Sequence, residues 1–184
     1  MPLKLFQIDS TLFHPDNMAM IKNDYSVHKE LFLFFNMNRG EEETIKSIEM
    51  EFAAGKGYTL KSIAKTDYID TASASLFSKR FVDSVGEVLK DEMQFFPCKV
   101  ICKGEAFDWY AARITHTFPI VDKERSTYRD LTDGRLVLSD AKYRTDIDEQ
   151  FFIARDSEDI SYFAVSDLFK ILCDENGLMI GFKE

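Results

Sequence analysis

Two stretches of this chain repeat one order of residues: "ASLFSKRFVDSV" at residues 74–85 and "FAVSDLFKIL" at residues 163–172. Each places two apolar residues before a serine and then continues with apolar residues at helical spacing. A serine hydroxyl at this point can accept a backbone N–H of the first turn, so Ser78 and Ser166 are predicted to be the N-caps of two amphipathic helices. An apolar run follows each helix after a polar gap, which predicts one strand–helix–strand unit written twice.

The first copy continues into a predicted β-hairpin. The segment "MQFFPCKVIC" at residues 93–102 reads as a strand, "KGE" at residues 103–105 as a turn, and "AFDWYAARITHTF" at residues 106–118 as the returning strand. The helix before this hairpin is predicted to carry an apolar stripe at Phe81, Val82, Val85, Val88 and Leu89. The first strand is predicted to turn one set of side chains to a single face: Phe96, Cys98, Val100 and Cys102.

The second copy is reached through short strands. These are predicted at "RLVLS" (135–139), "QFFIA" (150–154) and "SYFAVS" (161–166). The last two flank the polar "RDSEDI" and therefore predict a second hairpin. The helix capped by Ser166 is predicted to extend to about Asp174, after which Gly177 turns the chain into a closing strand. Two copies are too few for a solenoid, and we expect them to form a pseudo-symmetric pair flanking a common sheet.

The first third of the chain is the least regular part. "ELFLFFNMN" at residues 30–38 is an apolar, aromatic run of strand length. "SIEMEF" at residues 47–52 alternates apolar and acidic residues, which favours a half-buried strand, although its glutamates make a helix nearly as good. The glycines of "AAGKGY" at residues 53–58 predict a loop.

Length and composition set the fold class. With 184 residues and 45% hydrophobic side chains, the chain can build the core of one domain, or of two very small ones packed together. We predict a single α+β domain over residues 1–184, with a mainly antiparallel or mixed sheet and the two serine-capped helices packed on it. The repeated helix–strand unit would amount to an internal duplication. Residues 1–70 are the less readable part, and residues 71–184 carry the repeated units.

The charge of the chain limits its partners. Asp and Glu exceed Lys and Arg by 32 to 23, which gives a net charge of −9. Such a chain is not expected to bind nucleic acid, which needs a basic face, or an anionic membrane. An acidic surface favours a basic partner, because charge complementarity speeds encounter. The alternative is an acidity that serves only solubility.

The sequence also predicts a cytoplasmic location. Its N-terminal residues contain no apolar core long enough for a signal peptide, and the longest apolar run, residues 31–35, is far too short to span a bilayer. Three cysteines do not make a complete disulfide framework, which agrees with a reducing compartment.

Metal binding is not expected. His14, His28 and His116 lie far apart, and none belongs to a pair at ligand spacing. Cys98 and Cys102 share an apolar face of the predicted strand with Val100, so we expect them to be buried free thiols.

No residue pattern points to a catalytic group or a cofactor. The chain has no G-x-S-x-G elbow and no phosphate-binding glycine loop, and Cys173 lies in an amphipathic helix without a nearby histidine. Capping accounts for both Ser78 and Ser166. Carboxylates are plentiful, which keeps a small-molecule-modifying enzyme with a carboxylate site as an alternative.

Further short motifs lie between the two copies. Phe95-Phe96-Pro97 places a proline in an apolar strand, and "FPIVDKERS" at residues 118–126 contains Val121-Asp122 followed by Ser126. A "φ-φ-Leu" strand, a "Phe-φ-φ-Arg" strand, a second "φ-φ-Ser" helix and a terminal Gly-Leu strand complete the order. This order resembles family eleven of the bacterial immunity proteins encoded beside polymorphic toxin genes. The resemblance covers roughly residues 68–182.

The resemblance implies a function. A member of this family would bind one cognate toxin and neutralise it as a stoichiometric complex in the producing or kin cell. It implies no catalytic chemistry of its own, and no cofactor is expected. The acidity of the chain adds the expectation that the toxin has a basic surface. Two alternatives to this immunity function remain: the enzyme with a carboxylate site named above, and a structural or assembly protein without a toxin partner.

Two sets of residues are candidates for toxin contact. The first is an acidic segment that either meets a basic toxin surface or forms a solvated hairpin rim. Its members are Asp146, Asp148, Glu149, Asp156, Glu158 and Asp159. The second is a set of aromatic residues suited to anchor an interface, of which the tryptophan can equally belong to the core. Its members are Trp109, Tyr110, Tyr128 and Tyr143. Asp122 and Ser126 are better explained as a turn device, with the aspartate accepting local backbone N–H groups.

Overall fold

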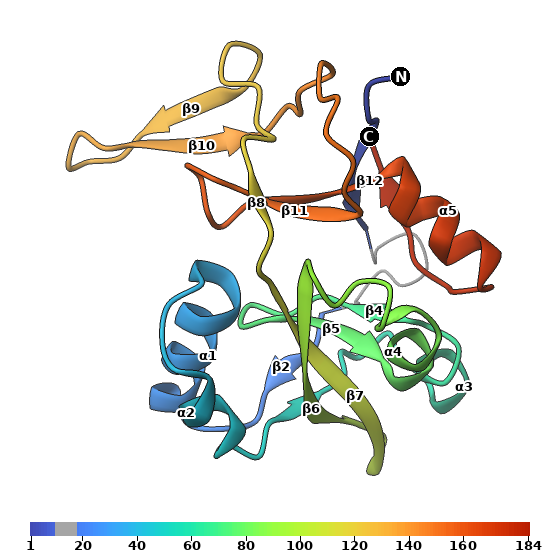
Figure 1. Cartoon of the computed structure of the whole chain (residues 1–184). Coiled ribbons are helices and arrows are strands. Elements are labelled where there is room, and N and C mark those ends of the chain that lie inside the picture. The colour runs from blue at the N-terminus through green and yellow to red at the C-terminus, as the bar shows by residue number, and fades with distance from the viewer. Residues whose placement is uncertain (10–17) are drawn as a thin grey trace.

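The computed structural model describes residues 1–9 and 18–184, and within them the strands form two main sheets and a separate two-stranded ribbon (Figure 1). The first sheet has the spatial order β2 (Met20–Ile21), β3 (Glu51–Ala53), β6 (Met93–Cys102), β7 (Glu105–Ile114), β5 (Ser75–Ser78) and β4 (Tyr68–Ile69). The second sheet has the order β13 (Phe182–Lys183), β1 (Leu5–Ile8), β12 (Phe163–Ser166), β11 (Ile153–Asp156) and β8 (Thr117–Phe118). The ribbon pairs β9 (Thr127–Asp130) with β10 (Leu136–Asp140).

The helices of the described residues complete the predicted α+β fold. They are α1 (Tyr25–Met37), α2 (Glu42–Lys46), α3 (Leu60–Ile63), α4 (Lys79–Val85) and α5 (Asp167–Glu175). Both sheets contain parallel as well as antiparallel neighbours, since β3 runs parallel to β6 and β8 parallel to β11. The fold class expected from the sequence is therefore confirmed.

Both predicted serine caps are present. α4 begins directly after Ser78, whose hydroxyl accepts the backbone N–H of Phe81 at 3.0 Å. α5 begins directly after Ser166, whose hydroxyl accepts the backbone N–H of Phe169 at 3.4 Å. Each serine is also the last residue of a strand, so in both copies the chain passes from strand to helix without a loop.

The two copies share a topology as well as a cap. We call β4, β5, α4 and β6 the first unit, and β11, β12, α5 and β13 the second unit. In each unit the two strands before the helix form an antiparallel pair. The strand after the helix runs parallel to the second of these, with one antiparallel strand between them. That intermediate strand is β7 in the first unit and β1 in the second.

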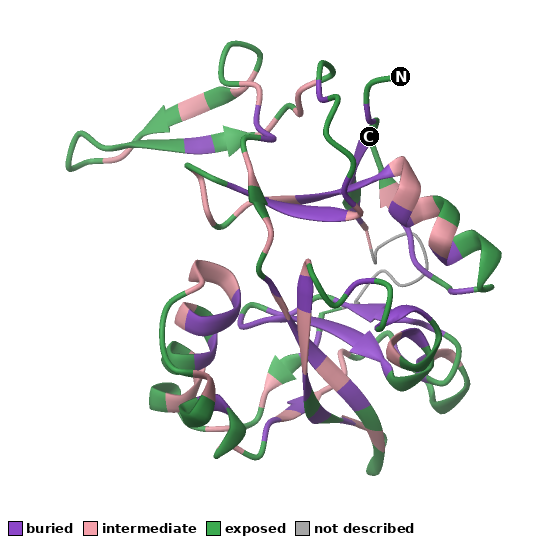
Figure 2. Ribbon diagram, in the orientation of Figure 1, coloured by how far each residue is buried: buried purple, intermediate pink, exposed green. Residues whose placement is uncertain are grey.

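The arrangement of the units corrects one expectation. They do not flank a common sheet, because each has its own intermediate strand and so builds its own sheet. Their helices meet instead in a core shared by the two sheets, where the rings of Phe81 and Phe169 lie 5.9 Å apart between centroids. Figure 2 shows β5 and β11, which belong to different units, buried along their length.

The predicted apolar stripe of the first helix is confirmed in part. Phe81, Val85 and Leu89 are buried in the shared core, and Val82 packs against it. The prediction for Val88 is wrong, because α4 ends at Val85 and the following turns leave the Val88 side chain 52% exposed.

The predicted hairpin of β6 and β7 is confirmed, but its second strand is shorter than predicted. β7 ends at Ile114, and Thr117–Phe118 form β8 in the second sheet. β6 and β7 pair continuously from Met93 opposite Ile114 to Cys102 opposite Glu105. The connecting residues Lys103 and Gly104 have φ of 50° and 84°, and the twist of such a two-residue turn matches the twist of the strands. The predicted buried face is also present, with four inward residues: Phe96, Cys98, Val100 and Cys102.

Residues 30–38 are the clearest error of the sequence prediction. Residues 30–37 belong to helix α1 and Asn38 is its C-cap, so this segment is not a strand. Asp24 caps the helix by accepting the backbone N–H of Val27 at 3.1 Å, and its apolar residues bury one helical face. The buried residues are Leu31, Phe34 and Phe35. Because the run is apolar at nearly every position, it hid the helical period.

The strand interpretation of residues 47–52 is confirmed for the last two residues. β3 begins at Glu51, and no helix covers this segment. Met50 and Phe52 are buried on one side while Glu49 is exposed on the other, as the alternation predicts. The loop expected from "AAGKGY" is present after Ala53, where β3 ends.

A buried arginine joins the second sheet to α1. Arg155 of β11 is 1% exposed, and its guanidinium donates to the backbone carbonyls of Phe35 at 2.8 Å and Asn36 at 3.1 Å. These carbonyls belong to the last turn of the helix, where the partial negative charge of the helix dipole favours a cation. A third bond, to the carbonyl of Ile160, fixes the β11–β12 turn to the same side chain.

Two carboxylates beside strands of the first sheet also join the sheets, by accepting backbone N–H groups in or before strands of the second sheet. Glu92, just before β6, accepts the backbone N–H groups of Phe152 and Ile153 at 2.9 and 2.8 Å. Asp67, which is fully buried, accepts the backbone N–H of Met179 at 2.7 Å. In each case a charged side chain of one sheet satisfies backbone groups of the other, which holds the sheets in a defined relation.

Candidate functional site

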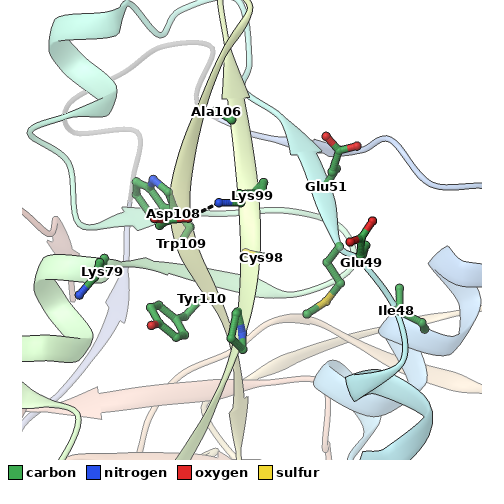
Figure 3. Close-up of a pocket in the computed structure, with 12 residues that line it drawn as sticks. Ile48, Glu49, Glu51, Lys79, Cys98, Lys99, Ala106, Asp108, Trp109 and Tyr110 are labelled. Carbon is green, nitrogen blue, oxygen red and sulfur yellow. Dashed lines mark hydrogen bonds and ion pairs between the residues drawn. The ribbon is translucent and has the colours of Figure 1, made fainter.

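A groove of about 760 Å³ crosses the outer face of the first sheet (Figure 3). We call it the β6–β7 groove. Its polar and apolar side chains come from β3, β6, β7 and the first turn of α4, and the groove also reaches the segment before β3. The residues used below are Glu49, Glu51, Lys79, Pro97, Lys99, Asp108 and Tyr110.

The groove exists because this sheet face is covered over only half its length. Met93 and Phe95 lie on the same face of β6 as Pro97 and Lys99, since strand side chains alternate. The first two pack into the core shared with α4 and α5, whereas Pro97 and Lys99 are exposed. The strand thus passes from beneath the helices into an open surface.

Pro97 marks a gap beside β6. β3 pairs with β6 only from Lys99 onward, so on this side Pro97 lies at an edge of the sheet. Proline has no backbone N–H to donate and is tolerated at such an edge. Pro97 also lines a second hollow of about 630 Å³, which continues from the β6–β7 groove toward α2 and α4.

Paired charges lie across the floor of the groove. Lys99 and Asp108 are cross-strand neighbours and form an ion pair. The Lys99 ammonium holds the pKa of the Asp108 carboxyl below its usual value through their hydrogen bond. At one side Lys79 binds Asp83 one turn further along α4, at 2.6 Å. Both lysines therefore already have acidic partners.

The opposite side of the groove is acidic. Figure 3 shows Glu49 and Glu51 on the side away from Lys79. Glu51 has a long ion pair, 3.9 Å, with Lys22, and no ion pair of the described residues involves Glu49. The negative charge on this side of the groove is therefore compensated only in part, at Glu51.

The groove offers surface for binding and little that resembles a reactive centre. Cys98 lies between Pro97 and Lys99 on β6, but its thiol faces the core on the inner side of the sheet. Burial raises the pKa of that thiol to about 12, so the thiolate needed for nucleophilic attack is scarce near neutral pH. The lowered pKa of Asp108 opposes a role as a general acid. The arrangement can bind a complementary surface through charge and the exposed part of Tyr110.

The predicted acidic segment does not form one surface patch. Asp156 is 2% exposed, and its carboxylate accepts four backbone N–H groups at 2.7 to 3.0 Å, so its assignment as a toxin contact is wrong. The four donors are Ile120, Val121, Glu158 and Asp159. A carboxylate that shapes two loops in this way cannot face a partner.

The other acids of the segment have different surroundings. Glu158 pairs with Lys123, and Asp146 accepts from Arg144 at 2.9 and 3.0 Å. Burial raises the pKa of the half-buried Asp159 carboxyl. Asp148 and Glu149 are exposed, and no ion pair of the described residues involves them. These two are the acids of the segment that remain open to a partner.

The predicted aromatic anchors also separate. Trp109 is 3% exposed and belongs to the core on the inner face of the first sheet, so the alternative interpretation as a core residue is correct. Tyr143 packs against the second sheet and donates to the carbonyl of Phe163 at 3.2 Å. Tyr128 is half-buried at the base of the ribbon. Only Tyr110 of the four reaches the β6–β7 groove with its side chain partly exposed.

The turn predicted around Asp122 is confirmed. Its carboxylate accepts the backbone N–H groups of Glu124 and Arg125, each at 3.1 Å, and Ser126 donates its backbone N–H to the Asp122 carbonyl. Ser126 then accepts the backbone N–H of Lys142 at 2.9 Å, which ties the turn to the end of β10. Both residues therefore serve the fold.

Cys98, Cys102 and Cys173 are buried free thiols, as predicted for the first two. No group of three or more His, Cys, Asp or Glu side chains within the described residues could hold a metal ion, and His14 lies outside those residues. No helix among them is long and apolar enough to cross a membrane.

Sequence analysis missed the acidic side of the groove, although a signal was present. The alternation of "SIEMEF" already turned Glu49 and Glu51 away from the core. In the same way, Pro97 and Lys99 alternate with the buried face of β6. What the sequence could not show is that β3 and β7 place these outward residues beside one another.

Comparison with known proteins adds no assignment. A scan against protein-family models finds none that matches this chain, and a search of curated proteins finds no match either.

Proposed function

We propose that this protein is an immunity protein that binds a cognate bacterial toxin and neutralises it by forming a stoichiometric complex. The proposal rests first on the order of motifs from residue 68 to residue 182, and the β6–β7 groove is the structural observation that supports it. A wide groove with an acidic side that is only partly compensated and a partly exposed tyrosine suits a protein surface that carries basic residues.

The overall charge supports the same partner. At a net charge of −9 the protein attracts a basic surface and repels nucleic acid, so it can compete for the basic groove of a toxin that acts on nucleic acid or on a nucleotide. The toxin would be blocked by occupancy, and the immunity protein would not be consumed or chemically changed.

Co-expression tests the proposal. A neighbouring reading frame that encodes a toxin domain is expressed alone and together with this protein, and the lack of any such frame would count against the proposal. We expect growth to be restored only in the presence of this protein, and the two chains to co-purify in a fixed ratio. Rescue without any complex would instead indicate an enzyme that acts on the toxin's substrate or product. No rescue and no complex would contradict the proposal.

A further inference from the structure

The β6–β7 groove is polarised, and its polarity indicates what it binds. Lys99 is neutralised by Asp108 and Lys79 by Asp83, so neither lysine is free to attract an acidic ligand. Glu49 has no ion pair within the described residues. The field that remains in the groove is negative along the β3 side.

The floor of the groove also offers an apolar contact. Pro97 lies opposite Tyr110 in the hairpin register, so the two side chains stand next to each other on the open face. A tyrosine ring beside a proline gives a rigid surface of low conformational entropy, which is typical of interface anchors. The apolar floor and the acidic side lie within one groove, so a single bound segment can contact both.

We propose that the β6–β7 groove binds a basic, extended segment of the toxin, with a lysine or arginine facing Glu49 and Glu51 and an apolar side chain packed against Pro97 and Tyr110. This inference rests on the proposed function and specifies its contact surface. Charge complementarity selects this occupant over an acidic peptide. Such a peptide would meet Glu49, which has no ion pair within the described residues, and Glu51, whose only ion pair there is the long one with Lys22. The two lysines of the groove already have acidic partners.

Three variants of the full chain test the groove against the purified toxin. Glu49→Gln/Glu51→Gln removes two charges from the acidic side, and Tyr110→Ala removes the ring. The matched control, Asp174→Asn/Glu175→Gln, removes two exposed acids from the last turn of helix α5 in the second unit, so both double variants change the net charge equally. All four residues changed to amides are exposed or half-exposed, so the midpoint temperature of thermal unfolding should stay close to that of the parent protein.

Surface-binding kinetics at two salt concentrations give the readout. We expect the groove double variant to weaken affinity by about tenfold or more at low salt, with a smaller loss at high salt, because salt screens the charges that were removed. Tyr110→Ala is expected to raise the dissociation rate by about tenfold with little change in association. The control should bind like the parent protein.

The outcomes separate this inference from the proposed function. If both groove variants bind the toxin with the affinity of the parent protein and rescue growth fully, the groove is not the contact surface, and the immunity function still stands. Equal losses in the groove variant and in the control would show that net charge matters and the groove does not, which also overturns the inference. Absence of any complex with the parent protein would overturn both.

Discussion

The first and second units have one topology but secure their serine caps differently. Ser78 donates to the buried carboxylate of Asp67, which also binds the Arg80 guanidinium and the backbone of Met179. Ser166 donates to the backbone carbonyl of Phe151 at 2.5 Å. The shared motif therefore fixes the local turn from strand to helix, while the environment decides how much of the fold depends on it.

The intermediate strands differ as well. β7 follows β6 directly through a two-residue turn, whereas β1 comes from the N-terminal part of the chain and is far in sequence from β12 and β13. One unit is thus completed by a local hairpin and the other by a distant strand. Each of the following predictions separates the units or shows that they act together.

The largest effect is expected from the rings that join the units. Phe81→Ala and Phe169→Ala each remove a fully buried ring and should cost about 3–5 kcal/mol of the free energy of unfolding. Because the two rings are in contact, the double variant should depart from the sum of the single costs by more than about 0.5 kcal/mol. Denaturant unfolding measures all three variants.

Phe52 supplies the control for this cycle. It is fully buried but belongs to the core on the other face of the first sheet. Phe52→Ala combined with Phe169→Ala should be additive within about 0.5 kcal/mol. Additivity in the Phe81/Phe169 pair would contradict a core shared by the two units.

The serine caps are expected to differ in cost. Ser78→Ala removes the cap of α4 and a hydrogen bond to a buried carboxylate, so it should cost about 2–3 kcal/mol of the free energy of unfolding. Ser166→Ala removes a cap and a bond to a carbonyl, and should cost about 1–2 kcal/mol. Thermal or denaturant unfolding gives the values, with Ser84→Ala on the exposed side of α4 as a control expected near zero. Equal costs would show that Asp67 adds nothing to the first cap.

Thiol labelling compares the units without a mutation. Burial raises the pKa of Cys98 in the first unit and of Cys173 in the second to about 12. At pH 8 we expect both to react with a thiol reagent only when the fold opens, at similar rates if the two units unfold together. Mass spectrometry of the labelled peptides reports each site, and fast labelling of one cysteine alone would indicate independent opening. The same preparation should contain no stoichiometric zinc.

The smallest effect is expected in the segment that leads into the second unit. Asp148→Asn/Glu149→Gln should slow toxin association by a factor of about two to five at low salt and have no effect at high salt, since only long-range attraction is lost. Stopped-flow mixing measures the association rate. Asp146, already paired with Arg144, is left unchanged so that no arginine is freed. If the association rate depends neither on salt nor on the double substitution, these acids form only a solvated rim.

The parts of the fold that the sequence could predict depend on local signals. A serine followed by helical spacing predicts α4 and α5, and the short polar turn after Cys102 predicts the β6–β7 hairpin. α1 was missed because Phe32, although 39% exposed, extends the apolar run across the helix surface and conceals the period. The capping residue Asp24 lies well before the apolar run, so the run itself does not mark where the helix begins.

The candidate site was less predictable because it depends on which part of the sheet face the helices leave uncovered. Tyr110 was identified from its residue type, but Trp109, its neighbour, points into the core. The turn role of Asp156 could have been found from its sequence, since an aspartate before polar residues commonly accepts nearby backbone N–H groups, as was predicted for Asp122. The groove itself depends on where α4 ends and where β3 begins. The sequence does not show that these two elements lie on either side of the β6–β7 hairpin.

β1 imposes an order of assembly on a chain that emerges from the ribosome in one direction. Every strand of the first sheet lies between Met20 and Ile114, so this sheet has all its strands before the second unit has been made. β1 is synthesised before any of them, yet Leu5 pairs with Ser166. Until then the edges of this early strand have no partner, and closing so long a connection slows the step. We expect a nascent chain to present a finished first sheet and an unpaired N-terminal strand, which makes β1 the segment most exposed to chaperones or to wrong pairing during synthesis.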